Sequence, residues 1–253
     1  MGGDVSVAAL ADWLSILDYG TFEVAEDGRQ IPIFGYAIGA GEHCVLVDTG
    51  FPNAYYEDAD SAGRADGLES FGRLVGVGPE NRPQAQLALL GLDSEDVTEL
   101  VITHGDVDHI GGLDDFPGAA IVVSRSEWEA GPPRYYGEVR AVGWPVDARY
   151  RLIDGDAELA PGVTLLATPG HSPGHLSLLV RLPECGAVVL ACDAISREAE
   201  LATGVNGGAS DNEAALGSAE RLLELARQLG ALLVYGHDPR QSGTLRRAPD
   251  RYR

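Results

Sequence analysis

The chain is organised around residues 101–112, which read Val101-Ile102-Thr103-His104-Gly105-Asp106-Val107-Asp108-His109-Ile110-Gly111-Gly112. Two apolar residues that end a predicted strand lead directly into four side chains able to bind a metal ion: His104, Asp106, Asp108 and His109. Side chains of like parity lie on one side of a strand, so His104, Asp106 and Asp108 converge if the strand geometry persists. The glycines permit a sharp turn and a close approach of the backbone. This density of imidazoles and carboxylates predicts a divalent-metal site rather than a polar turn with a capping aspartate.

Composition places the chain among ordinary globular proteins. Its 253 residues, 45% of them hydrophobic, suffice for one large domain or two small ones, and the sequence shows no linker, repeat or low-complexity tract. The apolar runs are too short to span a membrane, and Asp12 and Asp18 interrupt the N-terminal apolar stretch, which argues against a secretory signal. Cys44, Cys185 and Cys192 form a sparse, odd set that indicates a reducing compartment. We therefore predict a cytoplasmic protein.

The charge of the chain bears on its partners. It has 39 acidic and 18 basic residues, which gives a formal net charge of −21. A surface of this kind repels nucleic acid and anionic lipid, so we expect neither as a partner and predict a small-molecule substrate instead. A locally positive site remains compatible with this surface, because two divalent ions supply their own field. The sequence leaves the oligomeric state open.

Predicted strands alternate with predicted helices along the chain. Apolar runs indicate strands at 31–38, 44–47, 100–103, 119–123, 163–167, 176–180, 187–191 and 232–235. Helices are expected at 84–90 and from 210–213 to Leu229, where Gly230 stops the second one, and residues 126–129 have the spacing of a capping box. Residues 52–82 resemble a long loop or a lid, and 131–150 show no clear periodicity. The alternation predicts a layered α/β sandwich.

Five apolar runs end at a residue able to bind metal or at a small turn that contains one. These residues are Asp48, His104, His171, Asp193 and His237. Each alone is as well explained by a loop, a cap or a solvated group, but five together at strand ends predict an assembled site. His175 follows His171 by four residues and is expected to orient a ligand by hydrogen bonding, whereas His43 is expected to be exposed in a turn.

The order of these residues resembles the metallo-β-lactamase superfamily, whose metal signature is H-x-H-x-D-H. The segments Asp48-Thr49-Gly50, 168–178, Cys192-Asp193-Ala194 and Gly236-His237-Asp238 are most similar to the N-acyl homoserine lactonases, the quorum-quenching branch. The resemblance covers roughly residues 30–240. It implies a four-layer αββα sandwich and a single domain over residues 1–253.

The resemblance also implies roles for individual residues. One ion would be held by His104, Asp106 and His171, a second by Asp108, His109 and His237, and Asp193 would bridge them. Two such ions would bind one hydroxide, lower its pKa and polarise a carbonyl. Asp108 would hold the proton of that hydroxide and pass it to the leaving oxygen. The implied reaction is the opening of a lactone or the cleavage of a related carboxylic ester.

Two positions depart from the lactonase pattern. Asp106 stands where most of the superfamily has histidine, and an anionic oxygen ligand shifts metal preference from zinc toward manganese or iron. Alternatively, Asp106 binds no ion and the site holds one metal. The lactonases also place a catalytic tyrosine three residues after the bridging aspartate, where this chain has Ser196. A phenol is then missing unless a loop tyrosine reaches the site, for which the candidates are Tyr55, Tyr56, Tyr135 and Tyr136.

Other functions are compatible with the same residues. Asp106 makes the segment resemble the H-x-D-x-D-H-x-G-G of the nuclease-like domain of DNA-uptake channels, which keeps a dinuclear phosphodiesterase as the alternative. The flavodiiron oxygen reductases also have a carboxylate at this place, but they need a flavin domain for which 253 residues leave no room. A non-catalytic metal-binding protein on the same fold is the third reading. The substrate is chosen by loops and does not follow from the motif.

Overall fold

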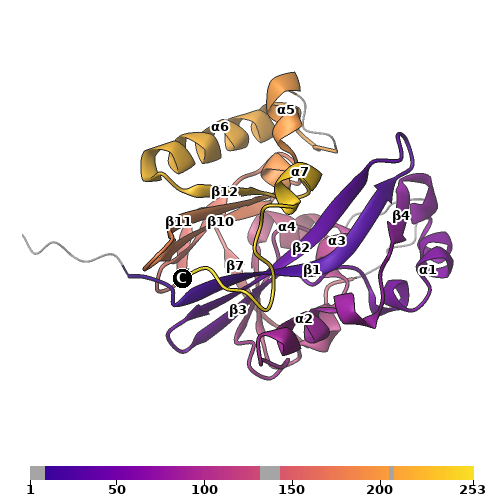
Figure 1. Ribbon diagram of the computed structural model, residues 1–253, viewed down its shortest axis with the longest axis horizontal. Coiled ribbons are helices and arrows are strands. Elements are labelled where there is room, and N and C mark those ends of the chain that lie inside the picture. Colours follow the sequence, from indigo (N-terminus) through magenta and orange to yellow (C-terminus); the bar gives the residue numbers. More distant parts are fainter. Residues whose placement is uncertain (1–8, 132–142, 205–207) are drawn as a thin grey trace, which may run out of the picture.

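Two β-sheets face each other at the centre of the protein (Figure 1). A computed structural model describes residues 9–131, 143–204 and 208–253. The first sheet contains, in spatial order, β4 (Gly72–Val75), β1 (Trp13–Val24), β2 (Gln30–Ala40), β3 (His43–Val47), β5 (Glu99–Val101), β6 (Ala120–Ser124) and β7 (Arg149–Ile153). The second contains β12 (Leu232–Tyr235), β11 (Gly186–Cys192), β10 (Leu176–Leu182), β9 (Val163–Ala167) and β8 (Ala157–Ala160).

Strand residues alternate between two apolar layers because successive side chains point to opposite faces of a sheet. On β10, Leu178 faces the layer between the sheets, whereas Leu179 faces the outer layer that α6 (Asn212–Leu229) covers. On β1, Ile16 lies between the sheets and Leu17 lies in the other outer layer. Three apolar clusters therefore separate four layers, which confirms the predicted αββα sandwich.

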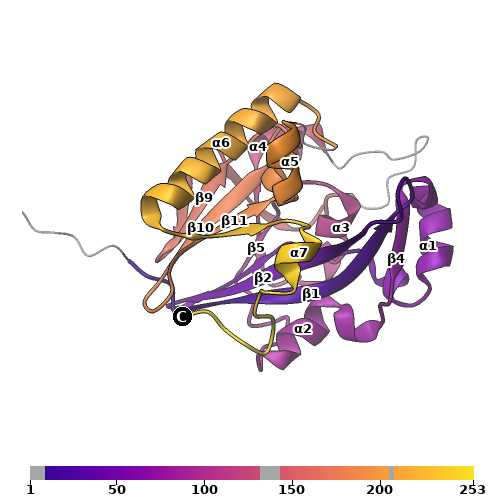
Figure 2. The same cartoon turned by 45° about the horizontal axis from the view of Figure 1, so that its top comes forward.

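Helices cover both outer faces, as Figure 2 shows for α6 above the second sheet and α2 below the first. The carboxylate of Asp211 caps α6 by accepting from two backbone N–H groups, one residue after the Ser210 that begins the predicted capping segment 210–213. Gly230 ends the helix at φ 59°, as the sequence predicts. The remaining α-helices are α1 (Ala59–Asp66), α2 (Pro83–Leu89), α3 (Val107–Ile110), α4 (Arg125–Ala130), α5 (Glu198–Thr203) and α7 (Pro239–Ser242). Short 3-10 helices are η1 (Asn53–Tyr56), η2 (Leu68–Ser70), η3 (Pro79–Asn81), η4 (Leu113–Asp115) and η5 (Asp193–Ile195).

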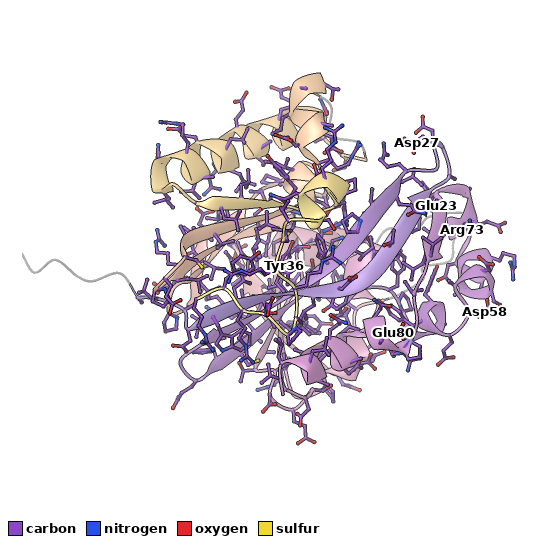
Figure 3. The ribbon with its side chains drawn as sticks, viewed as in Figure 1. Glu23, Asp27, Tyr36, Asp58, Arg73 and Glu80 are labelled. Carbon is purple, nitrogen blue, oxygen red and sulfur yellow. The ribbon has the colours of Figure 1, made fainter. Side chains whose placement is uncertain are left out.

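Residues 52–82 are not a long loop, so that alternative was wrong, although Leu68 and Phe71 of this segment line the cavity at the candidate site. They form η1, α1, η2 and β4, and β4 extends the first sheet by pairing with the end of β1. Arg73 on β4 forms an ion pair with Glu23 on β1 at 2.9 Å, at the outer end of the long β1–β2 hairpin (Figure 3). The segment is polar because most of its faces meet solvent, which hides its periodicity. Strand β1 also begins at Trp13, whereas the sequence indicates two or three strands within residues 21–50, the first apolar run being 31–38.

The strand directions bring the metal-competent residues to one edge. In the first sheet β3, β5 and β6 are parallel neighbours, so their carboxyl ends meet. In the second sheet β9 and β11 both pair antiparallel with β10, and β12 is parallel to β11, so these three strands also end together. Within the described ranges, no helix is long and apolar enough to cross a membrane.

Candidate metal centre

The segment 104–109 changes conformation within the candidate site. Strand β5 ends at Val101, Asp106 is the N-cap residue of α3 with ψ 151°, and α3 carries Asp108 and His109 in a single helical turn. The predicted convergence by strand parity was therefore wrong in its mechanism. Extended backbone up to Asp106, followed by the helical turn of α3, brings the four side chains together, and the turn presents the consecutive residues Asp108 and His109 to the same centre.

The structure brings all seven predicted site residues together in two triads and one shared carboxylate. The first triad consists of His104, Asp106 and His171, and the second consists of Asp108, His109 and His237. In the first, Asp106 Oδ2 lies 3.4 Å from His104 Nε2 and 3.2 Å from His171 Nε2. In the second, Asp108 Oδ2 lies 3.4 Å from His109 Nε2 and 3.9 Å from His237 Nε2.

Asp193 lies between the triads. Its Oδ1 is 3.0 Å from His237 Nε2 in the second triad, and its Oδ2 is 3.7 Å from His171 Nε2 in the first. Within each triad, and within a third group of His104, His109 and Asp193, the potential ligand atoms lie within 4.8 Å of one another. The carboxylate is thus placed to contact an ion on either side.

The donor atoms fit divalent cations. The Nε2 atoms of His104 and His109 are buried and have no hydrogen-bond partner of good geometry among the described residues. A buried nitrogen left in this way is unfavourable unless something else uses its lone pair or proton. Imidazole nitrogens mixed with carboxylate oxygens suit zinc, manganese and iron.

Asp48 supports the second triad from behind. Its Oδ2 lies 2.8 Å from His109 Nδ1, and its carboxylate accepts two further hydrogen bonds from the backbone and hydroxyl of Thr103. Asp48 itself adopts φ 59°, which is uncommon for a residue other than glycine. A carboxylate on Nδ1 leaves Nε2 free to bind an ion. The Nδ1 of His237 is similarly held by the carbonyl oxygen of Pro32 at 2.8 Å.

His175 supports Asp193, in agreement with its predicted role beside the ligands. Its Nε2 accepts the backbone N–H of Asp193 at 3.1 Å, and its Nδ1 lies 2.9 Å from Thr168 Oγ1. Burial and the nearby imidazole of His104 hold the pKa of His175 well below its ordinary value, so the ring is neutral and can accept. Cys192, the residue before Asp193, has φ 49°.

Opposite charges compensate for burial in the metal-free site. Burial disfavours the ionised form of Asp193, yet His237 and His109 hold its pKa well below the ordinary value. Burial likewise opposes protonation of His237, but the carboxylate of Asp193 raises the pKa of His237 to about 9. The pKa of His171 is raised by Asp106 against the same burial effect. The imidazoles and carboxylates of the triads are therefore linked in networks of close charge contacts.

A cavity of about 530 Å³ opens above the triads. Its floor is polar, and its outer wall is mainly apolar and comes from the β1–β2 hairpin, Phe51 and the segment around η2. The hairpin also contributes two charged side chains to the lining, Glu26 and Arg29. The apolar wall side chains are Phe22, Val24, Ile31, Ile33, Phe51, Leu68 and Phe71. Arg197 also lines the cavity and pairs with Glu200 at 3.2 Å. A small molecule with an apolar portion fits such a surface.

No tyrosine is among the described residues that line this cavity. Tyr55 is buried and donates its hydroxyl to Asp66 at 2.9 Å, and Tyr56 is buried and accepts from the backbone N–H of Phe51. Neither supplies the missing phenol, while Tyr135 and Tyr136 fall outside the described residues. Ser196 does line the cavity.

Sequence reasoning missed the supporting roles of two buried carboxylates beside the site. The sequence predicts Asp48 as one of five site residues at strand ends but gives it no role behind His109, and it places Glu127 only within a capping box that begins at Ser126. The N-cap of α4 is instead Ser124, whose hydroxyl accepts the Glu127 N–H at 3.1 Å. The available signal was positional, since both acids follow the carboxyl ends of parallel strands that neighbour β5.

Comparison with known proteins identifies the family. The Metallo-beta-lactamase superfamily profile matches residues 28–237. The N-acyl homoserine lactonase of Bacillus cereus is 32% identical over 213 residues, which cover 84% of this chain and 83% of that protein. The N-acyl homoserine lactonase AttM of Azorhizobium caulinodans is 33% identical over 181 residues, covering 66% and 68% respectively.

Solved structures agree with this result. A mutant of Bacillus thuringiensis AiiA with N-decanoyl-L-homoserine at its active site superposes with a TM-score of 0.84 at 30% identity, covering 96% of this chain and 100% of that one. An N-acyl homoserine lactone hydrolase with the product N-hexanoyl-L-homoserine at its catalytic metal centre gives the same TM-score and coverage at 29% identity. The chain therefore belongs to the metallo-β-lactamase superfamily, and it is an enzyme of the metallo-hydrolase type.

Proposed function

We propose that the protein is a metal-dependent hydrolase that opens a lactone or cleaves a related carboxylic ester. The observation that carries this proposal is the placement of two His/Asp triads around Asp193, on the floor of a cavity whose outer wall is mainly apolar. Such a cavity suits an uncharged acyl compound, with its carbonyl at the floor and its apolar portion against the wall.

The relatives favour lactones among these compounds. Proteins about one-third identical over most of the chain are N-acyl homoserine lactonases, and two related structures hold N-acyl-L-homoserine at the active site. N-acyl homoserine is the ring-opened form of the lactone. We therefore propose N-acyl homoserine lactones as the first substrates to test, and quorum quenching as the consequence of their hydrolysis.

The residues divide the work between binding ions and moving a proton. His104, Asp106 and His171 would hold one divalent ion, Asp108, His109 and His237 a second, and Asp193 would contact both. When bound, such ions activate water and polarise a carbonyl. Asp108 lines the cavity with 19% of its side chain exposed, so its carboxylate can take up the proton of the attacking water and return it to the leaving oxygen.

Ser196 occupies the position of the lactonase tyrosine. The serine side chain is shorter than that of tyrosine, and its hydroxyl lies at the cavity. This hydroxyl forms no hydrogen bond with another described residue. A carbonyl oxygen bound at the floor would meet this hydroxyl or a water in place of a phenol. We therefore expect substrate preferences that differ from those of the tyrosine-containing lactonases.

A phosphodiesterase is the second candidate, and one observation favours it. Asp106 lies within contact distance of both histidines of its triad, so the variant H-x-D-x-D-H motif forms part of the cluster. Manganese or iron would then compete with zinc for this triad. The net charge of −21 opposes binding of a polyanion, which leaves small phosphodiesters as the relevant substrates.

Substrate assays of metal-loaded protein separate the two candidates. N-hexanoyl and N-decanoyl homoserine lactones, a chromogenic carboxylic ester and a chromogenic phosphodiester would be offered to protein loaded with Zn²⁺ or Mn²⁺. Lactone opening releases one proton and adds one water, which a pH indicator and mass spectrometry detect. We expect turnover of lactone or ester that is lost after chelation and in Asp108→Asn. Turnover of the phosphodiester alone would replace the proposal by its alternative.

A further inference from the structure

Glu127 is a buried carboxylate whose hydrogen bonds all lead toward the first triad or to its own helix. It lies on α4, just after β6, with 2% of its surface exposed. Its Oε1 accepts the backbone N–H of Gly105 at 2.8 Å, and its Oε2 accepts the hydroxyl of Ser172 at 2.6 Å and the backbone N–H of Gly174 at 3.0 Å. An acid this deeply buried is tolerated because these donors replace water.

The three donors flank the residues of the first triad. Gly105 stands between His104 and Asp106, and Ser172 immediately follows His171. One loop leaves β5 of the first sheet and the other leaves β9 of the second sheet. A single carboxylate on a third element therefore joins the two loops that must approach each other to complete this triad.

The packing around Glu127 leaves little freedom to the second loop. A Cβ added to Gly174 would lie 2.0 Å from Ser124 Oγ and 2.2 Å from the backbone nitrogen of Glu127. The loop after His171 thus contacts the first turn of α4 directly, and only glycine fits between them. One oxygen of the Glu127 carboxylate binds Ser172 and Gly174 of this loop, and the other oxygen binds Gly105 of the first loop.

We propose that Glu127 is a positioning residue for the first triad, setting the separation of His104 and Asp106 from His171 that a divalent ion requires. This inference rests on the proposed function, because it takes the first triad to be an ion site. The second triad has its own supports in Asp48 and the Pro32 carbonyl, so loss of Glu127 should act on one ion only. Loss of such an outer partner typically weakens metal binding by about 10–100-fold.

Glu127→Gln is the sharpest test, because it keeps the size of the side chain. An amide has only one oxygen, so its NH₂ group must face either Gly105 or the pair Ser172 and Gly174, and at least one donor loses its acceptor. Metal-free wild type and variant would be titrated with Co²⁺, followed by its absorption and by calorimetry. We expect two bound ions in both proteins, with one of them weakened by about 10–100-fold in the variant.

Two further variants separate positioning from general destabilisation. Asp58→Ala removes the side-chain cap of α1, a helix that carries no triad residue, where Asp58 accepts the Ser61 N–H at 3.0 Å. It should lower the unfolding temperature while both Co²⁺ ions bind as in wild type. Ser172→Ala removes one of the three donors to Glu127 and should weaken the same ion as Glu127→Gln, by a smaller factor. It also tests the inference if Glu127→Gln does not fold.

The outcomes are distinct. Wild-type affinities for both ions in Glu127→Gln and in Ser172→Ala would overturn the inference while leaving the proposed function intact. Equal weakening of both ions would also overturn it, since the effect would not be local. A wild-type protein that binds no Co²⁺ would instead contradict the proposed function, and the inference with it.

Discussion

The two triads have the same composition, two imidazoles and one carboxylate, but they are held in different ways. In the second, both Nδ1 atoms contact an acceptor, the Asp48 carboxylate and the Pro32 carbonyl, each at 2.8 Å. In the first, His104 Nδ1 lies 3.1 Å from a hydroxyl, and His171 Nδ1 has no hydrogen-bond partner among the residues with described positions. Asp106 is also more exposed than Asp108, at 33% against 19%. The imidazoles of the second triad are thus held by direct hydrogen bonds to Asp48 and Pro32. For the first triad, Glu127 instead binds the two loops that carry the triad residues.

Removing the shared carboxylate should have the largest effect, because it belongs to both triads. In Asp193→Ala we expect both ions to bind more than about 100-fold more weakly, beyond the loss that an outer partner causes, and nearly all hydrolysis to disappear. Elemental analysis of protein purified without chelator, with circular dichroism as the control for folding, measures this. If the variant keeps two ions and full turnover, Asp193 is no more than a residue of the turn after β11.

The pH dependence of metal binding should distinguish the triads next. Against burial, carboxylates raise the pKa of His109 and His237 in the second triad and of His171 in the first, the value for His237 being about 9. Such histidines stabilise the metal-free fold below their unfolded pKa of about 6.5, and this stabilisation is lost as pH rises through the folded pKa.

Ions must displace these protons. We expect the affinity of both triads to rise with pH, because the raised pKa values mean that protons leave as an ion binds. The rise should be steeper at the second triad, where the pKa of two histidines is raised, than at the first, where that of His171 is raised. Co²⁺ titrations would be repeated at steps of about one pH unit between about pH 6 and pH 9. In a weakly buffered solution, the same titrations would also record the protons released as the ions bind. Equal slopes for both ions would remove this difference between the triads.

Asp48→Asn should weaken mainly the second triad, and so mirrors Glu127→Gln. The first triad meets Asp48 only indirectly, through the Thr103 hydroxyl that lies 3.1 Å from His104 Nδ1. The single amide oxygen of asparagine can accept only some of the hydrogen bonds that the two carboxylate oxygens of Asp48 accept. If the NH₂ group faced His109 Nδ1, that nitrogen would have to accept, and the imidazole proton would move to Nε2, the atom that an ion would bind. Asparagine tolerates φ 59° well, so the backbone gains no strain. We expect one ion to bind about 10–100-fold more weakly, measured by the same titration. Weakening of the ion that Glu127→Gln affects would show that the two supports are not independent.

Asp106→His should have the smallest effect, because it exchanges one metal ligand for another. An imidazole leaves more positive charge on the ion and favours zinc, so metal competition should shift toward zinc and the pH–rate profile toward lower pH. We expect the affinity change to remain below roughly 10-fold. If preference and profile both stay unchanged, Asp106 contributes no ligand atom and the first triad is incomplete.

The sequence predicted the layers of this fold because apolar periodicity survives wherever strands are buried on both faces. Strands around 44–47, 100–103 and 187–191, and the helix that ends before Gly230, were visible for this reason. The segment 52–82 was not, since α1 and β4 lie at the rim and are largely polar. The seven residues that the structure gathers were found because each lies close after an apolar run.

The supports of the site could not be found in the same way. Asp48 is predicted as a site residue from its place after the apolar run 44–47, but its contact with His109 is not. The contacts of Asp48 and Glu127 join segments that are distant in sequence, and local patterns do not reveal them. The failure at 104–109 has a similar cause. The change from extended backbone to a helical turn after Asp106 depends on the packing of α3 against the first sheet. The alternation of polar and apolar residues within the segment carries no information about that packing.

The apolar wall of the cavity has a consequence for specificity. Phe22 on β1, Leu68 on η2 and Phe71 just after it come from elements that carry no triad residue. Phe71 is 46% exposed and lies outside the buried core. Substitutions in this wall can therefore change which small molecules fit the cavity while the triad residues on its floor stay the same, so that specificity and chemistry can vary separately.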